Sequence, residues 1–331
     1  SQSASAMTLF GSKKDKKETT KPVQSDYNKL VGRDTMAIKG LMGVIQKEND
    51  YYLEIPKTLI GREILVSNKL LQVPQELNEA GVNKGINYEN KTIKFEWEKD
   101  LNKLNIREQR LTPEVYSFYA MAPSVKDNYI NPLIASLKIE GVSKDSASVV
   151  VKVTNLFNGK DECLNDVFNL INLGTSANSE LSRILSMKAF DNNVAATSEL
   201  TTVVHEGKSK TNITIVVSTS LILLPSRPMM GRLENQRVGY FTTSRLHYGD
   251  NQPEVATKNY ITRWKLEPKD TAAYMRGELV EPVKPIEFYI DHAVPANILP
   301  YIKKGILDWN KAFECAGFKN AVVVHEFTDS M

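Results

Sequence analysis

The stretch INYENKTIKFEWE (residues 86–98) decides the fold, because it is the clearest strand in the sequence. Its apolar residues Ile93, Phe95 and Trp97 alternate with charged residues, which is the period of two expected of a strand with one buried face. Similar stretches, rich in β-branched residues, predict further strands at residues 115–119, 133–139, 148–153, 201–205 and 212–224. The middle of the chain is therefore predicted to be mostly β.

Helical signals in this middle region are weak. Residues 161–173 hold apolar side chains at near-helical spacing, and residues 179–186 are predicted to form a helical turn or two. The strands follow one another without regular alternation with long helices. Residues 76–280 are therefore predicted to form a β-rich α+β domain dominated by antiparallel sheet.

The sequence before this domain predicts a leader and a small folded module. Residues 11–25 are charged, polar and nearly free of large apolar side chains, so residues 1–25 are expected to form a flexible leader. Residues 26–75 predict a small β-hairpin module, with two short strands around a polar turn, a break at Pro56 and a third segment.

The end of the chain has a different pattern, which begins after a Pro-containing stretch at residues 278–285. An extended segment leads to Pro295, which suits the first turn of a helix because its missing N–H costs nothing there. Apolar residues then recur at three- and four-residue steps, and Gly317 is suited to end the helix. The predicted core face of this helix is Ile298, Ile302, Ile306, Trp309 and Phe313. With a strand at residues 321–327, the pattern predicts a strand-helix-strand α/β unit with a parallel pair.

Composition excludes two classes of protein. The chain has 42 Lys and Arg against 39 Asp and Glu, and a surplus of three over 331 residues cannot sustain the field that nucleic-acid binding requires. No stretch approaches the roughly 20 apolar residues of a transmembrane helix. The hydrophobic fraction of 41% is that of an ordinary folded protein.

The two cysteines, Cys163 and Cys315, indicate neither a zinc site nor a disulfide scaffold, because they belong to no metal-binding spacing. Two unpaired cysteines are the favoured interpretation, and a single long-range disulfide stays open. The chain begins at Ser1, and its first residues are small and polar, as expected after a removed signal peptide or of a cloning remnant.

Candidate catalytic groups are few. The motif HExxH binds zinc because histidines at i and i+4 share one helix face. Ser209 and Asp329 stand where a second histidine would be needed, so each His-Glu pair is only half of the motif. No GxSxG, Walker or GxGxxG pattern is present either. The four histidines are His205, His247, His292 and His325.

Four motifs near the end carry a family resemblance. They are RVGYF at residues 237–241, RWKLEP at 263–268, KPIEFYID at 284–291 and WNKAFECAGFKNA at 309–321. Together they resemble a bacterial family of large zinc-dependent metalloproteases that carry two N-terminal domains of unknown function. The similarity is strongest in the last third and extends more loosely over residues 27–324.

The resemblance implies that residues 281–331 are the beginning of a truncated, metzincin-like catalytic domain. The zinc-binding helix HExxHxxGxxH of that family would follow later, so no catalytic or metal-binding residue is expected in this chain. Zinc is expected only in the full-length parent, and this chain alone is expected to be inactive. The resemblance also implies secretion or a periplasmic location after signal-peptide removal.

The best-matching segment contributes four candidate contact residues, Arg237, Tyr240, Arg263 and Trp264. An Arg can fork onto a carboxylate, and Trp or Tyr can supply large anchoring surfaces. Their expected partners are the chain's own C-terminal catalytic domain and a peptide or protein substrate, and packing against the catalytic domain is favoured.

Three functions stay open from the sequence. The favoured one is the non-catalytic front part of a metalloprotease, acting as prodomain, folding aid or substrate-positioning platform. The second is a freestanding extracytoplasmic protein whose sheet binds a peptide or glycan. The third is an enzyme with an unrecognised carboxylate pair, which a sequence alone does not reveal.

Overall fold

The computed structural model describes most of the chain, and it divides into two compact units between Pro228 and Met229. The predicted leader and Cys163 lie outside the described residues. No helix in the described part of the chain is both long and apolar enough to cross a bilayer. The described residues are 27–31, 36–110, 113–159, 164–168, 171, 173, 176–206, 209–251 and 254–327.

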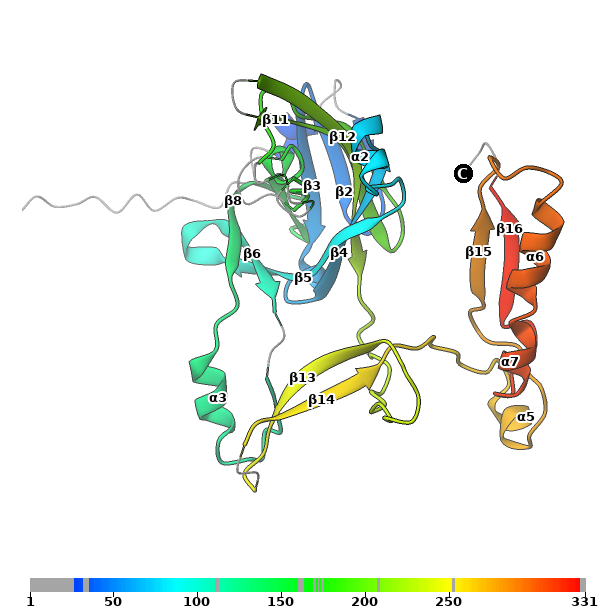
Figure 1. Cartoon of the computed structure of the whole chain (residues 1–331). Helices are drawn as coiled ribbons and strands as arrows, with labels where there is room; N and C mark the ends of the chain where they lie inside the picture. Colours follow the sequence, from blue (N-terminus) through cyan, green and yellow to red (C-terminus); the bar gives the residue numbers. More distant parts are fainter. Residues whose placement is uncertain are drawn as a thin grey trace, which may run out of the picture. The chain divides into compact units, whose positions relative to one another are not determined.

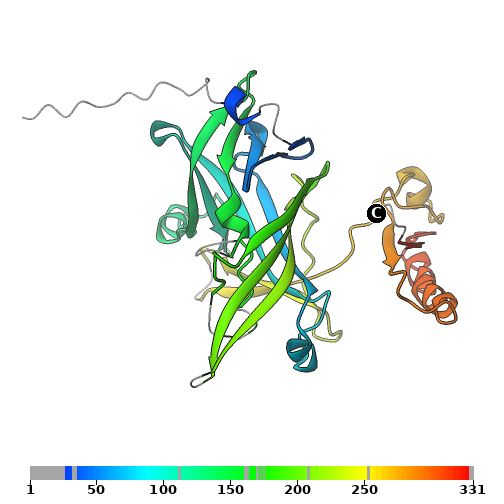
Figure 2. The ribbon, with the colours of Figure 1, turned by 90° about the horizontal axis from the view of Figure 1, so that it is seen from above.

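The first unit is built on one large antiparallel sheet, to which the described residues contribute eleven strands. The sheet curves until its ends meet, as Figures 1 and 2 show. The N–H of Leu41, next to the strand at one edge, donates to the carbonyl of Phe190 at the other edge over 2.7 Å. In spatial order the strands are β1 (Met36–Ile38), β2 (Gly43–Lys47), β3 (Asp50–Pro56), β9 (Ser148–Lys152), β8 (Leu133–Val142), β6 (Lys103–Gln109), β5 (Asn87–Glu98), β4 (Glu63–Gln72), β12 (Ser209–Leu223), β11 (Asn193–Glu206) and β10 (Arg183–Ala189).

Alternation along the strands fills the interior of this nearly closed sheet. In β5, Ile93 and Phe95 are at most 2% exposed, as the alternation of apolar and charged residues predicts. Helices in this unit are short: α1 (Tyr27–Leu30), η1 (Lys57–Leu59), α2 (Gln75–Glu79), η2 (Lys99–Leu101), α3 (Ala122–Asn128) and α4 (Thr154–Phe157). The expectation of a β-rich, mostly antiparallel fold is confirmed.

Several local expectations differ from the structure. Residues 179–186, expected to be helical, lead into strand β10, because Met187 and its neighbours alternate against β11 and cover the core. The strand expected at 115–119 is limited to β7 (Glu114–Val115), since turns follow it. The helix expected at 161–173 lies partly outside the described residues, and residues 164–168 form turns. The boundary expected near residue 75 does not interrupt the sheet, because β4 pairs with β5 on one side and β12 on the other.

The second unit contains a hairpin and a strand-helix-strand unit. The hairpin is β13 (Thr242–Tyr248) and β14 (Ala256–Ile261). After α5 (Thr271–Met275), strands β15 (Ile286–Ile290) and β16 (Val322–Glu326) pair in parallel, as the sequence predicts. Between them lie α6 (Leu299–Leu307) and α7 (Asn310–Glu314). The boundary expected at residues 278–285 falls within this unit.

The predicted helix between the parallel strands is split into two, and its predicted core face is only partly correct. Trp309, at the break between α6 and α7, is 66% exposed rather than buried. Phe313, in contrast, packs against the small core formed by Ala273, Val280 and Phe318. The apolar spacing predicts one continuous buried face, but Trp309 lies outside that core and Ile298 is also exposed, at 45%.

Candidate interaction site

The described residues do not form a zinc site. The four histidines lie on different elements, and no group of three His, Cys, Asp or Glu residues is placed to hold a metal ion in the described part of the chain. His247 on β13 is buried, whereas His292 is exposed. His325 on β16 packs against the ring of Tyr289, with centroids 5.1 Å apart. Zinc chemistry therefore has no ligand set among these residues.

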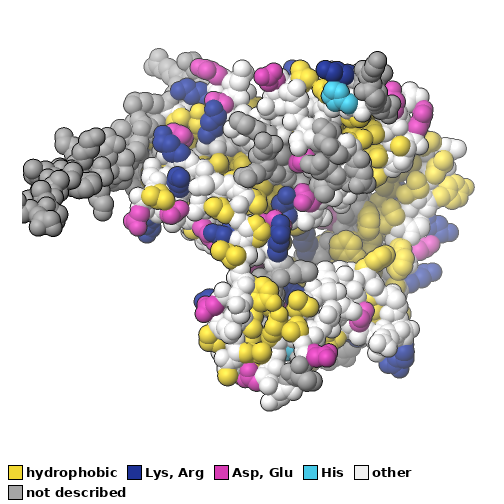
Figure 3. Space-filling model, turned by 60° about the vertical axis from the view of Figure 1, so that its left-hand side comes forward, with side chains coloured by type: hydrophobic (Ala, Val, Ile, Leu, Met, Phe, Trp, Pro, Cys, Tyr) yellow, Lys and Arg dark blue, Asp and Glu magenta, His cyan; other side chains and the backbone are white. Residues whose placement is uncertain are grey.

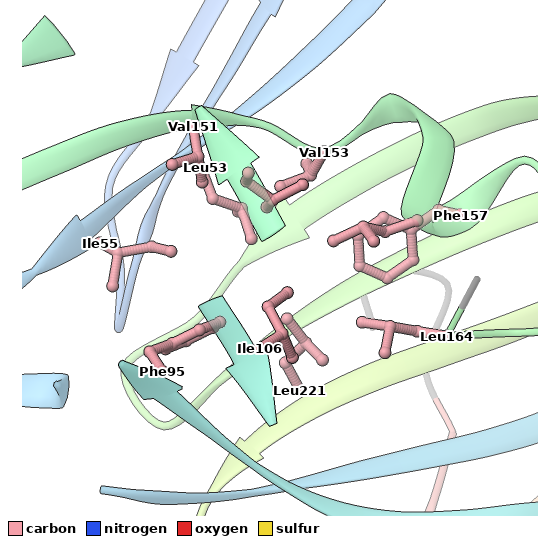
Figure 4. Close-up of a pocket in the computed structure, with 11 residues that line it drawn as sticks. Leu53, Ile55, Phe95, Ile106, Val151, Val153, Phe157, Leu164 and Leu221 are labelled. Carbon is pink, nitrogen blue, oxygen red and sulfur yellow. The ribbon is translucent and has the colours of Figure 1, made fainter. Parts of the chain in front are cut away.

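The interior of the large sheet is filled with apolar side chains. A cavity lined entirely by apolar residues lies there, and its volume is only about 10 Å³ (Figure 4). A single water molecule needs roughly that much space. This cavity is therefore a small packing defect, and it has no room for a larger ligand. The labelled lining residues, Leu53, Ile55, Phe95, Ile106, Val151, Val153, Phe157, Leu164 and Leu221, come from strands and connections around the interior.

The candidate contact residues lie in a segment that we call the basic aromatic segment (residues 229–265). Its first part runs beside β14: the N–H of Glu234 donates to the carbonyl of Asn259, and the N–H of Ile261 donates to the carbonyl of Arg232, both over 2.9 Å. The N–H of Thr262 then donates to the carbonyl of Phe241 over 2.8 Å. Hydrogen bonds along both edges of β14 thus fix the backbone of this segment.

These bonds bring two of the candidate residues onto adjoining stretches of backbone. Phe241 is bonded to Thr262. Tyr240 precedes Phe241 and Arg263 follows Thr262, so both residues are adjacent to that contact. The guanidinium of Arg263 donates to the carbonyl of Met230 over 2.9 Å. The structure thereby joins the two sequence motifs that carry Tyr240 and Arg263.

Arg237 and Trp264 are held differently. The Nε of Arg237 donates to the side-chain oxygen of Asn235 over 3.1 Å, and Trp264 is 60% exposed. The guanidiniums of Arg237 and Arg263 both bond neutral oxygen atoms, so their positive charge is not neutralised by these contacts. Both arginines can still attract a carboxylate.

The basic aromatic segment combines positive charge with exposed apolar side chains. It contains six basic and three acidic residues, which gives a net charge of plus three. Exposed hydrophobic side chains also gather in groups on the molecular face drawn in Figure 3. An exposed set of this kind marks a surface suited to bind another protein. The exposed large hydrophobics of the segment are Met230, Leu233, Val238, Tyr240, Phe241, Leu246, Val255 and Trp264.

The backbone at Gly231 approaches an aromatic ring closely. A Cβ at this position would lie 2.7 Å from the ring of Tyr260, closer than real Cβ atoms come to other atoms. Gly231→Ala is expected to push the segment away from β14, and hydrogen exchange at Glu234 and Ile261 should become faster. Gly239→Ala is the matched control, because a Cβ there meets nothing within 4 Å. Equal protection in both variants would contradict the expectation.

The strand-helix-strand unit also exposes apolar side chains. Phe288 and Tyr289 on β15 are 41% and 42% exposed, and Tyr301 on α6 is 76% exposed. Among the described residues, β15 pairs only with β16. The unit is therefore a two-stranded parallel sheet with an uncovered aromatic surface.

One aromatic group was missed from the sequence. Tyr116 and Phe118 stack with their ring centroids 5.3 Å apart, and Tyr119 packs edge-on against both. Phe118 is 77% exposed. The sequence YSFYA at residues 116–120 carries the signal, but its alternation favours a strand.

Comparison with known proteins gives family membership and no more. A family model described as a domain of unknown function, DUF5117, matches residues 85–269. A second model, for the domain of unknown function DUF5118, matches residues 24–73. No curated protein and no solved structure matches the chain.

Proposed function

The chain belongs to the DUF5117 family of unknown function, and from this premise we propose that it is the non-catalytic front part of a zinc metalloprotease. In this proposal the basic aromatic segment contacts the catalytic domain, and the front part acts as a prodomain, folding aid or substrate-positioning platform. The observation that carries the proposal is the parallel pair of β15 and β16 with its uncovered aromatic surface.

A parallel sheet of this size is not a complete structure. Parallel sheets occur almost only with both faces covered, and two strands alone are marginally stable at best. Phe288, Tyr289 and Phe327 are each more than 40% exposed, so the unit leaves several aromatic side chains in water. Further strands of a catalytic domain, added beside β15, would cover this surface and satisfy its open edge.

The basic aromatic segment supports the same proposal. Its exposed Trp264 and Phe241 are the residue types that anchor protein interfaces, and Arg237 and Arg263 can pair with carboxylates of a partner. A catalytic domain that presents carboxylates and apolar side chains fits this surface. The zinc would be held by that domain, since the described residues here do not supply a ligand set. An extracytoplasmic location belongs to the proposal and rests on the family resemblance.

The first experiment determines the coding sequence beyond residue 331 and then measures zinc binding and casein cleavage by the encoded polypeptide. The extended polypeptide is expected to contain HExxHxxGxxH, to bind one zinc ion and to cleave casein, whereas residues 1–331 alone should do neither. A frame that ends without a zinc motif would contradict the proposal and favour the freestanding peptide- or glycan-binding protein. Tight equimolar zinc with cleavage by residues 1–331 alone would also contradict it.

The second experiment tests the contact surface. The double variant Arg237→Glu and Arg263→Glu is expected to weaken binding to the separately produced catalytic domain at least about tenfold, because two attractive charges become repulsive. Isothermal titration calorimetry measures the Kd. The matched control reverses two exposed charges of the first unit, Lys84→Glu before β5 and Lys188→Glu on β10, and should leave the Kd unchanged. Equal affinities for both double variants would remove the basic aromatic segment from the interface.

A further inference from the structure

Three neighbouring strands of the large sheet each place one fully buried polar residue between apolar inward-facing neighbours. These residues are Asn68 on β4, Thr219 on β12 and Ser198 on β11, and each is 0% exposed. The register pairs Asn68 directly with Thr219. Thr219 also pairs with Ala196 on β11, and Ser198 is the next inward-facing residue of that strand. On one strand pair, directly opposite side chains have Cβ atoms about 5 Å apart.

A fourth buried polar residue comes from the connection after α4. Asn165 is also 0% exposed, and it stands between Leu164, in the larger apolar core, and Val167, in a smaller one. The inward rows divide in the same way, since Val66 belongs to the larger core and Leu70 to the smaller. The four polar residues therefore lie where the two cores meet. We call them the core polar site.

Hydrogen bonds orient the two amides of this site. The Nδ2 of Asn68 donates to the carbonyl of Leu164, and the Nδ2 of Asn165 donates to the carbonyl of Phe157, both over 2.9 Å. With both amide nitrogens engaged, the amide oxygens remain. Within the described chain the Oδ1 atoms of Asn68 and Asn165, and the hydroxyl oxygens of Ser198 and Thr219, have no hydrogen-bond partner.

Four fully buried oxygens without partners would be costly, since buried polar atoms in folded proteins nearly always form hydrogen bonds. We propose that the core polar site binds ordered water, which bridges the two amide oxygens to the two hydroxyls. A water molecule donates twice and accepts twice, so it can donate to Asn68 and Asn165 and accept from Ser198 and Thr219.

Water fits this site better than a cation does. All four side chains are neutral, and a buried ion without a counter-charge is far more costly than a buried neutral molecule. The bridging water also fastens the connection at residues 164–168 to three strands at once. The site thus links the sheet to residues 164–168 through hydrogen bonds.

A crystal structure of the chain at high resolution tests the occupant. Electron density about 2.8 Å from at least two of the four oxygens is the expected result. Direct hydrogen bonds among the four side chains, or an empty site, would overturn the proposal. Contacts nearer 2.4 Å, together with a Tm that rises on adding Na⁺, would replace water by a cation and also overturn it.

Variants test the site in solution. Thr219→Val keeps the shape of the side chain and removes its hydroxyl, and it is expected to lose at least one long-lived water in magnetic relaxation dispersion. Its Tm should fall by roughly 2–4 °C. Thr219→Ser retains the hydroxyl and should retain the water, which distinguishes lost hydration from general misfolding. The exposed Thr211→Val is the matched control and should change neither measurement. An unchanged number of long-lived waters in Thr219→Val would overturn the proposal.

Discussion

Phe157→Ala is expected to lower the free energy of unfolding of the first unit by about 3–5 kcal/mol. Phe157 ends α4, is 0% exposed and belongs to the larger apolar core. In Figure 4 its ring reaches into the interior beside Leu164. Its neighbours in that core, such as Leu53 and Ile106, are at most 2% exposed, so the closely packed surroundings can collapse little around a missing ring.

Urea denaturation followed by circular dichroism measures this effect, and Phe118→Ala is the matched control in the same unit. Phe118 is 77% exposed, so its removal loses only the ring contacts with Tyr116 and Tyr119 and should lower the free energy of unfolding by no more than about 1.5 kcal/mol. Comparable losses in the two variants would mean that Phe157 is not part of a close-packed interior.

Gly317→Ala is expected to destabilise the strand-helix-strand unit by about 1–3 kcal/mol. Gly317 follows α7 with φ of 90°, a left-handed conformation that costs energy for any residue with a Cβ. The added Cβ would also lie 2.6 Å from the ring of Tyr274, and that ring is held by a hydrogen bond from its hydroxyl to the carbonyl of Ala316. The ring therefore cannot move away freely.

Gly305→Ala makes the same chemical change inside α6, where the opposite sign is expected. A Cβ at this position meets nothing within 4 Å, and alanine has the higher helix propensity. The variant should gain about 0.5–1 kcal/mol. Thermal unfolding of both variants tests the pair, and a shift of the same sign in both would contradict the structural explanation.

The sequence predicts the strands well where one face is apolar. Strands β5, β8, β9 and β16 lie close to their predicted positions, because alternation in β5 and runs of valine in β9 and β16 both mark strands in the sequence. The parallel order of β15 and β16 is also predicted correctly, since the helical segment between them is long enough for a crossover.

The strand partners and the burial of single residues that the sequence does not predict depend on contacts between distant segments. Nothing in the pattern of residues 63–72 shows that β4 lies between β5 and β12, because strand partners are not encoded locally. Trp309 has the spacing of a core residue, yet the helix breaks beside it and leaves it exposed. Of the four candidate contact residues, Tyr240 and Arg263 are neighbours of the bonded pair Phe241 and Thr262, and this required the hairpin to be known.

The place of β4 in the sheet has an evolutionary consequence. The strand belongs to the region matched by DUF5118, but both of its neighbours, β5 and β12, belong to the region matched by DUF5117. A gene rearrangement that carried one region away would leave the other with a sheet split through its centre. The two regions are therefore expected to pass between genomes as a pair, with neither able to spread as an independent module.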